Sequence, residues 1–124
     1  MSWTYVQSTG HLFFNDELIY ENGYSGKGIY KNSPNMEHLT AKGPIPKGEY
    51  KISEPRKSTN TGPYVLPLSP VGHNAWGRSA FQIHGDSIKN PGTASSGCII
   101  LPRYIRTKIW ESKDRSLIVI GNQE

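Results

Sequence analysis

Two side chains of this sequence, Cys98 and His84, have the chemistry of a nucleophile and its base. Cys98 is the only cysteine, and His84 is one of four histidines. A thiol attacks carbonyl groups strongly only as the thiolate, and a neighbouring imidazole can take up its proton. Two interpretations stay open at this point: a catalytic Cys–His pair, or a buried thiol beside an unrelated histidine.

The residues around this pair suit acyl transfer. Gly97 lets the backbone approach a substrate carbonyl closely, and the N–H groups of Gly97 and Cys98 are predicted to form an oxyanion hole. Asp86 follows two residues after His84, so on a continuing strand it would share the face of His84 and orient the imidazole. Aspartate also caps turns, and this is the role that we expect of Asp86.

Two predicted strands carry the pair. The segment SAFQIHG, residues 79–85, alternates, with Phe81 and Ile83 on one face and His84 on the other. The segment CIIL, residues 98–101, is a short apolar run that is typical of a buried strand. If these strands are neighbours, the loop that joins them brings the two side chains together.

The rest of the chain predicts a mainly β fold. Glycine (13) and proline (9) recur between short β-branched or aromatic segments of the 124 residues, a pattern of many strands joined by turns. The other expected strands are SWTYVQ, the two halves of GHLFFNDELIYENG around a turn at Asn15-Asp16, GEYKISE, YVLPLSP and LIVIG. Pro67 is expected to put YVLPLSP at a sheet edge.

One short helix is predicted after the cysteine. PRYIRTKIWESK, residues 102–113, has Pro102 in its first turn and an apolar stripe through Ile105 and Ile109. We therefore expect a single domain over residues 1–124, with the architecture of a β-sandwich or partly closed barrel. The polar segment 24–48, rich in glycine and proline, is expected to be a substrate-binding loop.

Composition narrows the class of protein. The net charge of +4 is spread along the chain. The sequence has no basic stripe interleaved with aromatic residues, so its composition does not favour nucleic-acid binding. No segment has the ~20 apolar residues of a transmembrane helix. The single cysteine excludes an intramolecular disulfide, and the N-terminal stretch MSWTYVQSTGHLFF does not have the pattern of a secretory signal.

The block IHGDS…ASSGCIIL resembles the active-site signature of YkuD-type L,D-transpeptidases, which is His-Gly, a loop, and then Ser-x-Gly-Cys. The segments GRSAFQIHG and GPIPKGEYKI also resemble this superfamily. GYSGKG and the short length make the sequence most similar to the L,D-transpeptidase effectors delivered by type VI secretion. The resemblance spans nearly the whole chain, from Trp3 to Ile120.

The resemblance implies a peptidoglycan-modifying enzyme that needs neither cofactor nor metal. Cys98 matches the nucleophile and His84 the base, and they act on the bond between meso-diaminopimelate and D-Ala in tetrapeptide stems. A thioester forms on the cysteine and D-Ala leaves. Water as the acceptor gives L,D-carboxypeptidase activity, whereas an amine gives transpeptidation or D-amino-acid exchange.

Two positions depart from the family pattern. Many YkuD enzymes have a second histidine between the serine and the glycine, where this chain has Ser96, and many have Arg or Asn two residues after the cysteine, where it has Ile100. The group that holds the diaminopimelate carboxylate is therefore open, and Arg78 and Arg103 are candidates because a guanidinium binds a carboxylate through two hydrogen bonds. The other predicted substrate contacts are Gly85, Asp86, Ser95 and Ser96.

The resemblance to these effectors implies a protein that is made in the cytoplasm without a signal peptide and acts in the periplasm of a rival bacterium. Its expected partners are the stem tetrapeptide, a type VI-like secretion machinery and a cognate immunity protein. Two alternatives remain. One is a metal-dependent peptidase or amidase built on His73, His84 and Asp86, and the other is a non-catalytic wall-binding module with exposed aromatic loops.

Overall fold

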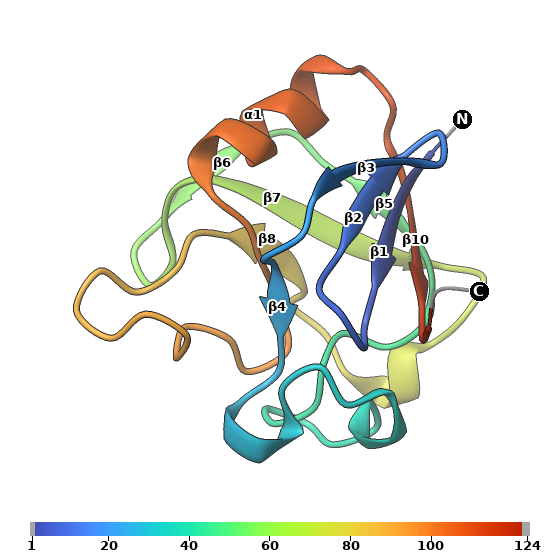
Figure 1. Ribbon diagram of the computed structural model, residues 1–124, viewed down its shortest axis with the longest axis vertical. Coiled ribbons are helices and arrows are strands. Elements are labelled where there is room, and N and C mark those ends of the chain that lie inside the picture. The colour runs from blue at the N-terminus through green and yellow to red at the C-terminus, as the bar shows by residue number, and fades with distance from the viewer. Residues whose placement is uncertain (1, 123–124) are drawn as a thin grey trace.

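Strands dominate the computed structural model, which describes residues 2–122 (Figure 1). Ten strands form one mixed arrangement in the order β3-β2-β1-β10-β5-β7-β8-β9-β4, with β6 paired to β7. A single α-helix, α1, packs on β7 and β8. The mainly β fold with one helix after the cysteine, predicted from the sequence, is therefore confirmed.

The strands are short, as the frequent glycine and proline residues predict. They are β1 (Trp3–Val6), β2 (Leu12–Phe14), β3 (Glu17–Tyr20), β4 (Tyr24–Ser25), β5 (Gly48–Ile52), β6 (Arg56–Ser58), β7 (Gly62–Val71), β8 (Gln82–His84), β9 (Ile99–Ile100) and β10 (Ser116–Ile120). Helix α1 spans Arg103–Glu111, and three 3-10 turns are η1 (Gly28–Tyr30), η2 (Pro34–Met36) and η3 (Ala75–Gly77). Within residues 2–122, no helix is long and apolar enough to span a bilayer.

The N-terminal hairpin forms where the sequence predicts it. Asn15 and Asp16 connect β2 and β3, and their φ angles of 51° and 67° are both in the left-handed region that a type I′ turn requires. Strand β1 pairs in parallel with β10, with Trp3 opposite Leu117. The first and last strands of the described chain therefore lie side by side within the sheet (Figure 1).

Strand β7 joins the two halves of the sheet, which corrects the expectation that Pro67 marks an edge. β7 lies between β5 and β8, and β6 continues on the side of β5. The β5 ladder ends where Ile52 faces Leu68, and the β6 ladder begins where Arg56 faces Val65. Pro67 is tolerated because it falls in the gap between these two ladders, where its missing N–H costs no ladder hydrogen bond.

The strand that carries His84 and the strand that begins directly after Cys98 are neighbours. β8 and β9 run parallel, with Ile83 opposite Ile99 and His84 opposite Ile100. Ile83 and Ile99 are fully buried in the core, beneath Ile105 and Ile109 of α1. Because side chains alternate along strands, Cys98 and His84 share the opposite face of this strand pair.

The long segment 24–48 has little regular structure but is fastened to the site. The Ser25 hydroxyl donates to the Gly97 carbonyl at 3.3 Å and accepts from the Ile45 N–H at 2.8 Å. The Gly26 N–H donates to Ser95 Oγ at 2.9 Å. These buried bonds hold the loop against the turn that precedes Cys98.

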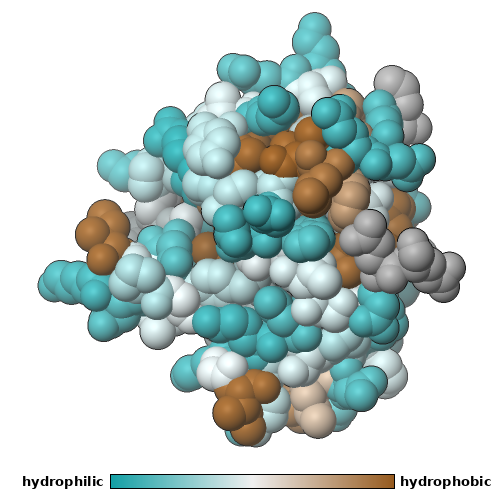
Figure 2. All heavy atoms as spheres, in the orientation of Figure 1, coloured by the Kyte–Doolittle hydropathy of each residue, from teal (hydrophilic) through white to brown (hydrophobic). Residues whose placement is uncertain are grey.

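The face shown in Figure 2 is mostly hydrophilic, with one larger apolar area in its upper centre, near α1 and β3. Two smaller and separate apolar spots lie over the loop 85–95 and over the region of η1. The exposed apolar side chains of these segments are Ile88 (98% exposed) and Ile29 (86% exposed). Scattered side chains of this kind are ordinary for a protein surface and do not by themselves define a binding site.

Candidate active site

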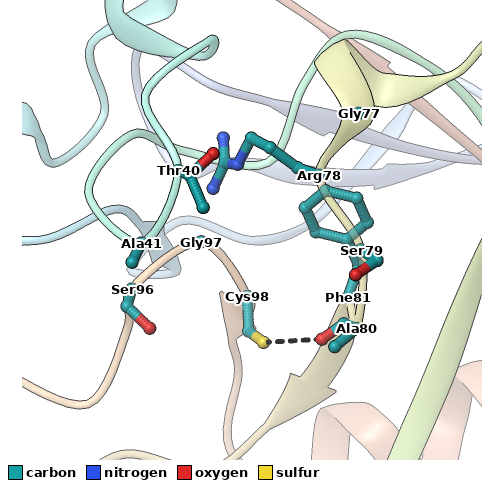
Figure 3. Close-up of a pocket in the computed structure, with 10 residues that line it drawn as sticks. All are labelled: Thr40, Ala41, Gly77, Arg78, Ser79, Ala80, Phe81, Ser96, Gly97 and Cys98. Carbon is teal, nitrogen blue, oxygen red and sulfur yellow. Dashed lines mark hydrogen bonds between the residues drawn. The ribbon is translucent and has the colours of Figure 1, made fainter.

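Cys98 borders an open cavity of about 260 Å³ at the head of β9 (Figure 3). One wall is the segment 77–81 between η3 and β8, and the other comes from Thr40 and Ala41 of the long loop. Ser96 and Gly97 complete the rim. The thiol is therefore open to a ligand, and the loop predicted to bind substrate lines the same cavity.

The backbone around this cavity is strained at several points. Ala80 and Ala41 have φ angles of 63° and 62°, which are left-handed values that cost free energy for residues with a Cβ. The conformation of Ala80 brings its carbonyl oxygen to 3.8 Å from the Cys98 Sγ, and the S–H donates to it (Figure 3). Strain of this kind collects at functional sites, and here it surrounds the thiol.

His84 is buried, with 3% of its surface exposed. Its Nδ1 lies 2.9 Å from the Gly85 carbonyl oxygen, which only accepts hydrogen bonds. Nδ1 therefore carries the proton, which leaves Nε2 with the lone pair that a base needs. Burial lowers the pKa of His84 below its ordinary value, and the positive charge of Arg106 adds to this effect, so the neutral, proton-accepting form is favoured.

The thiol and the imidazole do not touch in the described residues. The Cys98 S–H donates to the Ala80 carbonyl oxygen, while His84 lines a separate cavity of about 480 Å³ beside the loop 85–94. Burial raises the pKa of the Cys98 thiol, and the backbone of Gln82 and the positive charge of Arg78 offset this only in part. The resting site thus holds a neutral thiol and a neutral imidazole, on one face of neighbouring strands but without a hydrogen bond between them.

The turn before Cys98 is built by Ser95. Its buried hydroxyl accepts from the N–H groups of Gly26 and Gly97 and donates to the Cys98 carbonyl at 2.6 Å. The Gly97 N–H, which the sequence predicts for an oxyanion hole, is therefore occupied by Ser95 at 3.1 Å. The Cys98 N–H stays the predicted oxyanion donor, while Ser95 has the geometry of a structural residue.

Arg78 is buried beside the thiol, where it fastens the long loop. Its guanidinium donates to the carbonyl oxygens of Glu37 at 2.5 Å, Pro44 at 2.8 Å and Gly43 at 3.1 Å. A Cβ at Gly97 would overlap Arg78 Nη2, which explains the glycine at that position. With these three acceptors in place, Arg78 has few donors left for a substrate carboxylate, so that role stays a prediction.

A second buried arginine, Arg106 of α1, packs against the backbone next to His84. It donates to the carbonyl oxygens of Leu101 at 2.5 Å and Tyr64 at 3.0 Å. A Cβ on Gly85 would lie only 2.9 Å from Arg106 Nη1. Gly85 therefore lets the guanidinium pack against the backbone whose carbonyl orients His84.

Asp86 organises the loop 85–94 instead of orienting His84. Its Oδ1 accepts from the Tyr24 hydroxyl at 2.5 Å and from the Ser87 N–H at 2.8 Å. Its Oδ2 accepts from the Gly92 N–H at 3.0 Å. The turn-capping role expected from the sequence thus agrees with the geometry.

The residues considered for a metal site do not come together. His73 donates from Nε2 to the Glu49 carbonyl at 3.0 Å and accepts from the Ala75 N–H at Nδ1, so both ring nitrogens have protein partners. His84 and Asp86 border a different cavity from His73. Over residues 2–122, no three His, Cys, Asp or Glu side chains gather in a way that could hold a metal ion.

Sequence reasoning missed Glu37 and Ala80. Glu37 is 7% exposed, and its carboxylate accepts from Gln7, Lys47 and Trp76 at 3.0, 2.7 and 2.6 Å. It fixes the middle of the loop 24–48, just before Thr40 and Ala41, which form one cavity wall. An acidic residue inside a polar loop gives no sign of burial, and nothing in the sequence indicates the left-handed backbone of Ala80.

A solved structure shares the fold of this protein. It is similar to the crystal structure of L,D-transpeptidase (Yku) from Stackebrandtia nassauensis, with a TM-score of 0.51 and 18% identity over 97% of this chain and 54% of that chain. The chain thus spans about half the length of that protein, and at this identity the likeness shows an L,D-transpeptidase fold. None of the curated proteins compared with the chain matches it.

The family follows from the sequence itself. The model of the Tlde1 domain matches residues 20–119, and the chain belongs to this family, the type VI L,D-transpeptidase effectors. The resemblance noted in the sequence is therefore confirmed. Family and fold together support an enzyme-like, peptidoglycan-modifying effector.

Proposed function

We propose that this protein is a cysteine L,D-transpeptidase or L,D-carboxypeptidase that cleaves the meso-diaminopimelate–D-Ala bond of tetrapeptide stems. The observation that carries the proposal is the placement of the single thiol at an open cavity, on the same face as a buried histidine with a basic Nε2. Membership of the Tlde1 domain family supports peptidoglycan as the substrate. Hydrolysis or transfer depends on whether water or an amine is the acceptor.

The first step is attack by Cys98. Sγ turns from the Ala80 carbonyl toward His84, which a change of the χ1 rotamer allows because both side chains share one face. His84 Nε2 takes the thiol proton as Sγ bonds to the carbonyl carbon of diaminopimelate. The Cys98 N–H stabilises the oxyanion that forms. Catalytic hydrogen bonds are often long without substrate, so the absence of an Sγ–Nε2 bond at rest is compatible with this step.

The second step releases D-Ala and then the stem. His84 gives its proton to the D-Ala nitrogen, the carbon–nitrogen bond breaks, and a thioester remains on Cys98. His84, neutral again, removes a proton from water or from an amine, which attacks the thioester and frees the thiolate to be reprotonated. The products are D-Ala and either a tripeptide stem or an exchanged or cross-linked stem.

The proposed reaction is tested on purified peptidoglycan. Muropeptides with tetrapeptide stems, incubated with the protein and separated by mass spectrometry, should lose D-Ala and become tripeptides, or exchange it when a D-amino acid is added. Cys98→Ala should show neither product, since it removes the nucleophile. Tetrapeptides that stay unchanged with the wild-type protein, or that are trimmed equally by Cys98→Ala, would refute the proposal.

The place of action is proposed to be the periplasm of a target cell, reached through a type VI-like machinery. Trimmed or exchanged stems would no longer donate to cross-links, so the wall weakens as the cell grows. A producing cell would need an immunity protein that blocks the Cys98 cavity. A signal-fused periplasmic form should cause swelling or lysis, whereas the cytoplasmic form and signal-fused Cys98→Ala should not; equal toxicity of both wild-type forms would contradict this placement.

A further inference from the structure

Trp76 is a largely exposed aromatic side chain whose orientation is fixed. It is 62% exposed, yet its Nε1 donates to Glu37 Oε2 at 2.6 Å, and its backbone N–H donates to Asn74 Oδ1 at 3.2 Å. The ring of His38 lies at an angle to the indole, with the two centroids 6.0 Å apart. The indole is therefore held in one orientation before any ligand arrives, which lowers the entropy cost of binding.

The support beneath Trp76 is unusual for a surface residue. Glu37, its hydrogen-bond acceptor, is buried and is itself held by Gln7 and Lys47. Ala75 and Trp76 have φ angles of 52° and 59°, so two successive residues with side chains adopt the left-handed region. Such strain persists only where the surroundings enforce it, and it occurs mostly at functional sites.

Trp76 borders a cavity of its own, and the next residue in the chain, Gly77, lines the cavity of Cys98. The cavity beside Trp76 has a volume of about 280 Å³, and Lys47 and Asn74 supply polar groups to it. The 3-10 turn η3 lies between the two cavities: Ala75 and Trp76 line the one, and Gly77 lines the other. One short turn of the backbone therefore contributes to both cavities.

We propose that Trp76 and this cavity bind the glycan strand of peptidoglycan, a chain of β-1,4-linked N-acetylated amino sugars. The inference rests on the proposed function, because the stem cleaved at Cys98 is covalently attached to such a chain. A pyranose ring has a face of C–H groups that stacks on an aromatic ring and a rim of polar groups that hydrogen-bond. The fixed indole is suited to stack on the C–H face of a sugar ring, and the Lys47 and Asn74 side chains are suited to hydrogen-bond with its polar groups.

The proposal is tested by titrating the wild-type protein with the β-1,4-linked tetramer of N-acetylglucosamine, which has no peptide bond to cleave. The chain has three tryptophans, so the indole N–H region of a ¹⁵N-correlated spectrum serves as its own control. The Trp76 signal should shift on titration, while Trp3, which is 1% exposed, should not. Trp76→Ala should weaken binding at least about tenfold, and Trp76→Tyr should restore part of it.

A kinetic comparison separates this inference from the proposed function. The ratio of kcat/KM for glycan-linked stems to that for free tetrapeptides should fall at least about fivefold in Trp76→Ala. Tyr104→Ala, which removes an aromatic side chain that is 67% exposed on α1, should leave the ratio unchanged. If neither substrate reacts, the proposed function fails, but the titration still decides the inference.

Three results would overturn the glycan site. They are a Trp76 signal that does not move with the sugar, a signal that moves with protein concentration alone, and an unchanged kcat/KM ratio in Trp76→Ala. The second would identify the indole as a contact between copies of the chain. The titration is measured on the wild-type protein, so it still tests the glycan site if the Trp76→Ala variant fails to fold.

Discussion

Removing the negative charge of Glu37 should make the protein less stable at neutral pH but not in acid. Burial alone would raise the pKa of this carboxyl, but hydrogen bonds from Lys47, Trp76 and Gln7 outweigh it and bring the pKa from 4.5 to about 2. Because folding lowers the pKa of Glu37, its charged form stabilises the folded protein at pH values above the pKa of the unfolded state. This stabilisation is lost as the pH falls toward 2. A shift of this size corresponds to about 3 kcal/mol.

The assay is urea unfolding of the wild-type protein and Glu37→Gln between about pH 7 and pH 2.5. The difference in the free energy of unfolding between the two proteins should shrink by about 2.5 kcal/mol over this range, since most of the wild-type advantage is gone by then. Glu54→Gln, a change at an exposed position, is the matched control, and its difference from the wild type should stay within about 0.5 kcal/mol. A Glu37→Gln difference that is the same at every pH would refute the account of this buried carboxylate.

Three further predictions concern the site. Alkylation of Cys98 by iodoacetamide should accelerate only at a more alkaline pH than for an ordinary thiol, because burial raises the pKa of Cys98. An alkylation rate that has already levelled off at neutral pH would indicate a resting thiolate instead. Gly97→Ala should lower the free energy of unfolding by about 1–3 kcal/mol, as judged by urea unfolding, because φ is 139° and the new methyl group meets Arg78; a wild-type midpoint would contradict the packing described. His84→Ala should reduce kcat/KM on tetrapeptides by at least about 100-fold, and Asp86→Asn much less, since Asp86 holds only the loop; the reverse order would reject His84 as the base.

The strands of the site could be predicted because their patterns are local. Alternation in SAFQIHG predicts the strand of His84, which is β8, and the apolar run CIIL predicts β9, which begins one residue after Cys98. The sequence does not predict that these two strands pair with each other, since the spacing of segments along the chain does not determine which strands are neighbours. The hairpin turn at Asn15-Asp16 can also be predicted from the sequence, because both residue types tolerate the left-handed backbone that the turn needs.

Predictions failed or stayed open where distant contacts decide the structure. Pro67 suggested an edge strand, but the gap between two ladders lets β7 lie inside the sheet. Ser95 was expected at the substrate, yet its hydroxyl is used up by three backbone groups. Arg78 is a candidate for binding a carboxylate, but it donates to carbonyl groups of the loop 24–48, which lie 41 and 34 residues earlier in the chain. None of these partners can be read from neighbouring residues.

The central claim is that Cys98 carries the stem as a thioester. The most direct test is the intact mass of the protein, quenched in acid during incubation with a tetrapeptide stem. The account predicts a species heavier by the tripeptide acyl group, located on the peptide that contains Cys98 and absent from Cys98→Ala. Release of D-Ala without such a species at any time, or the same adduct on Cys98→Ala, would contradict it.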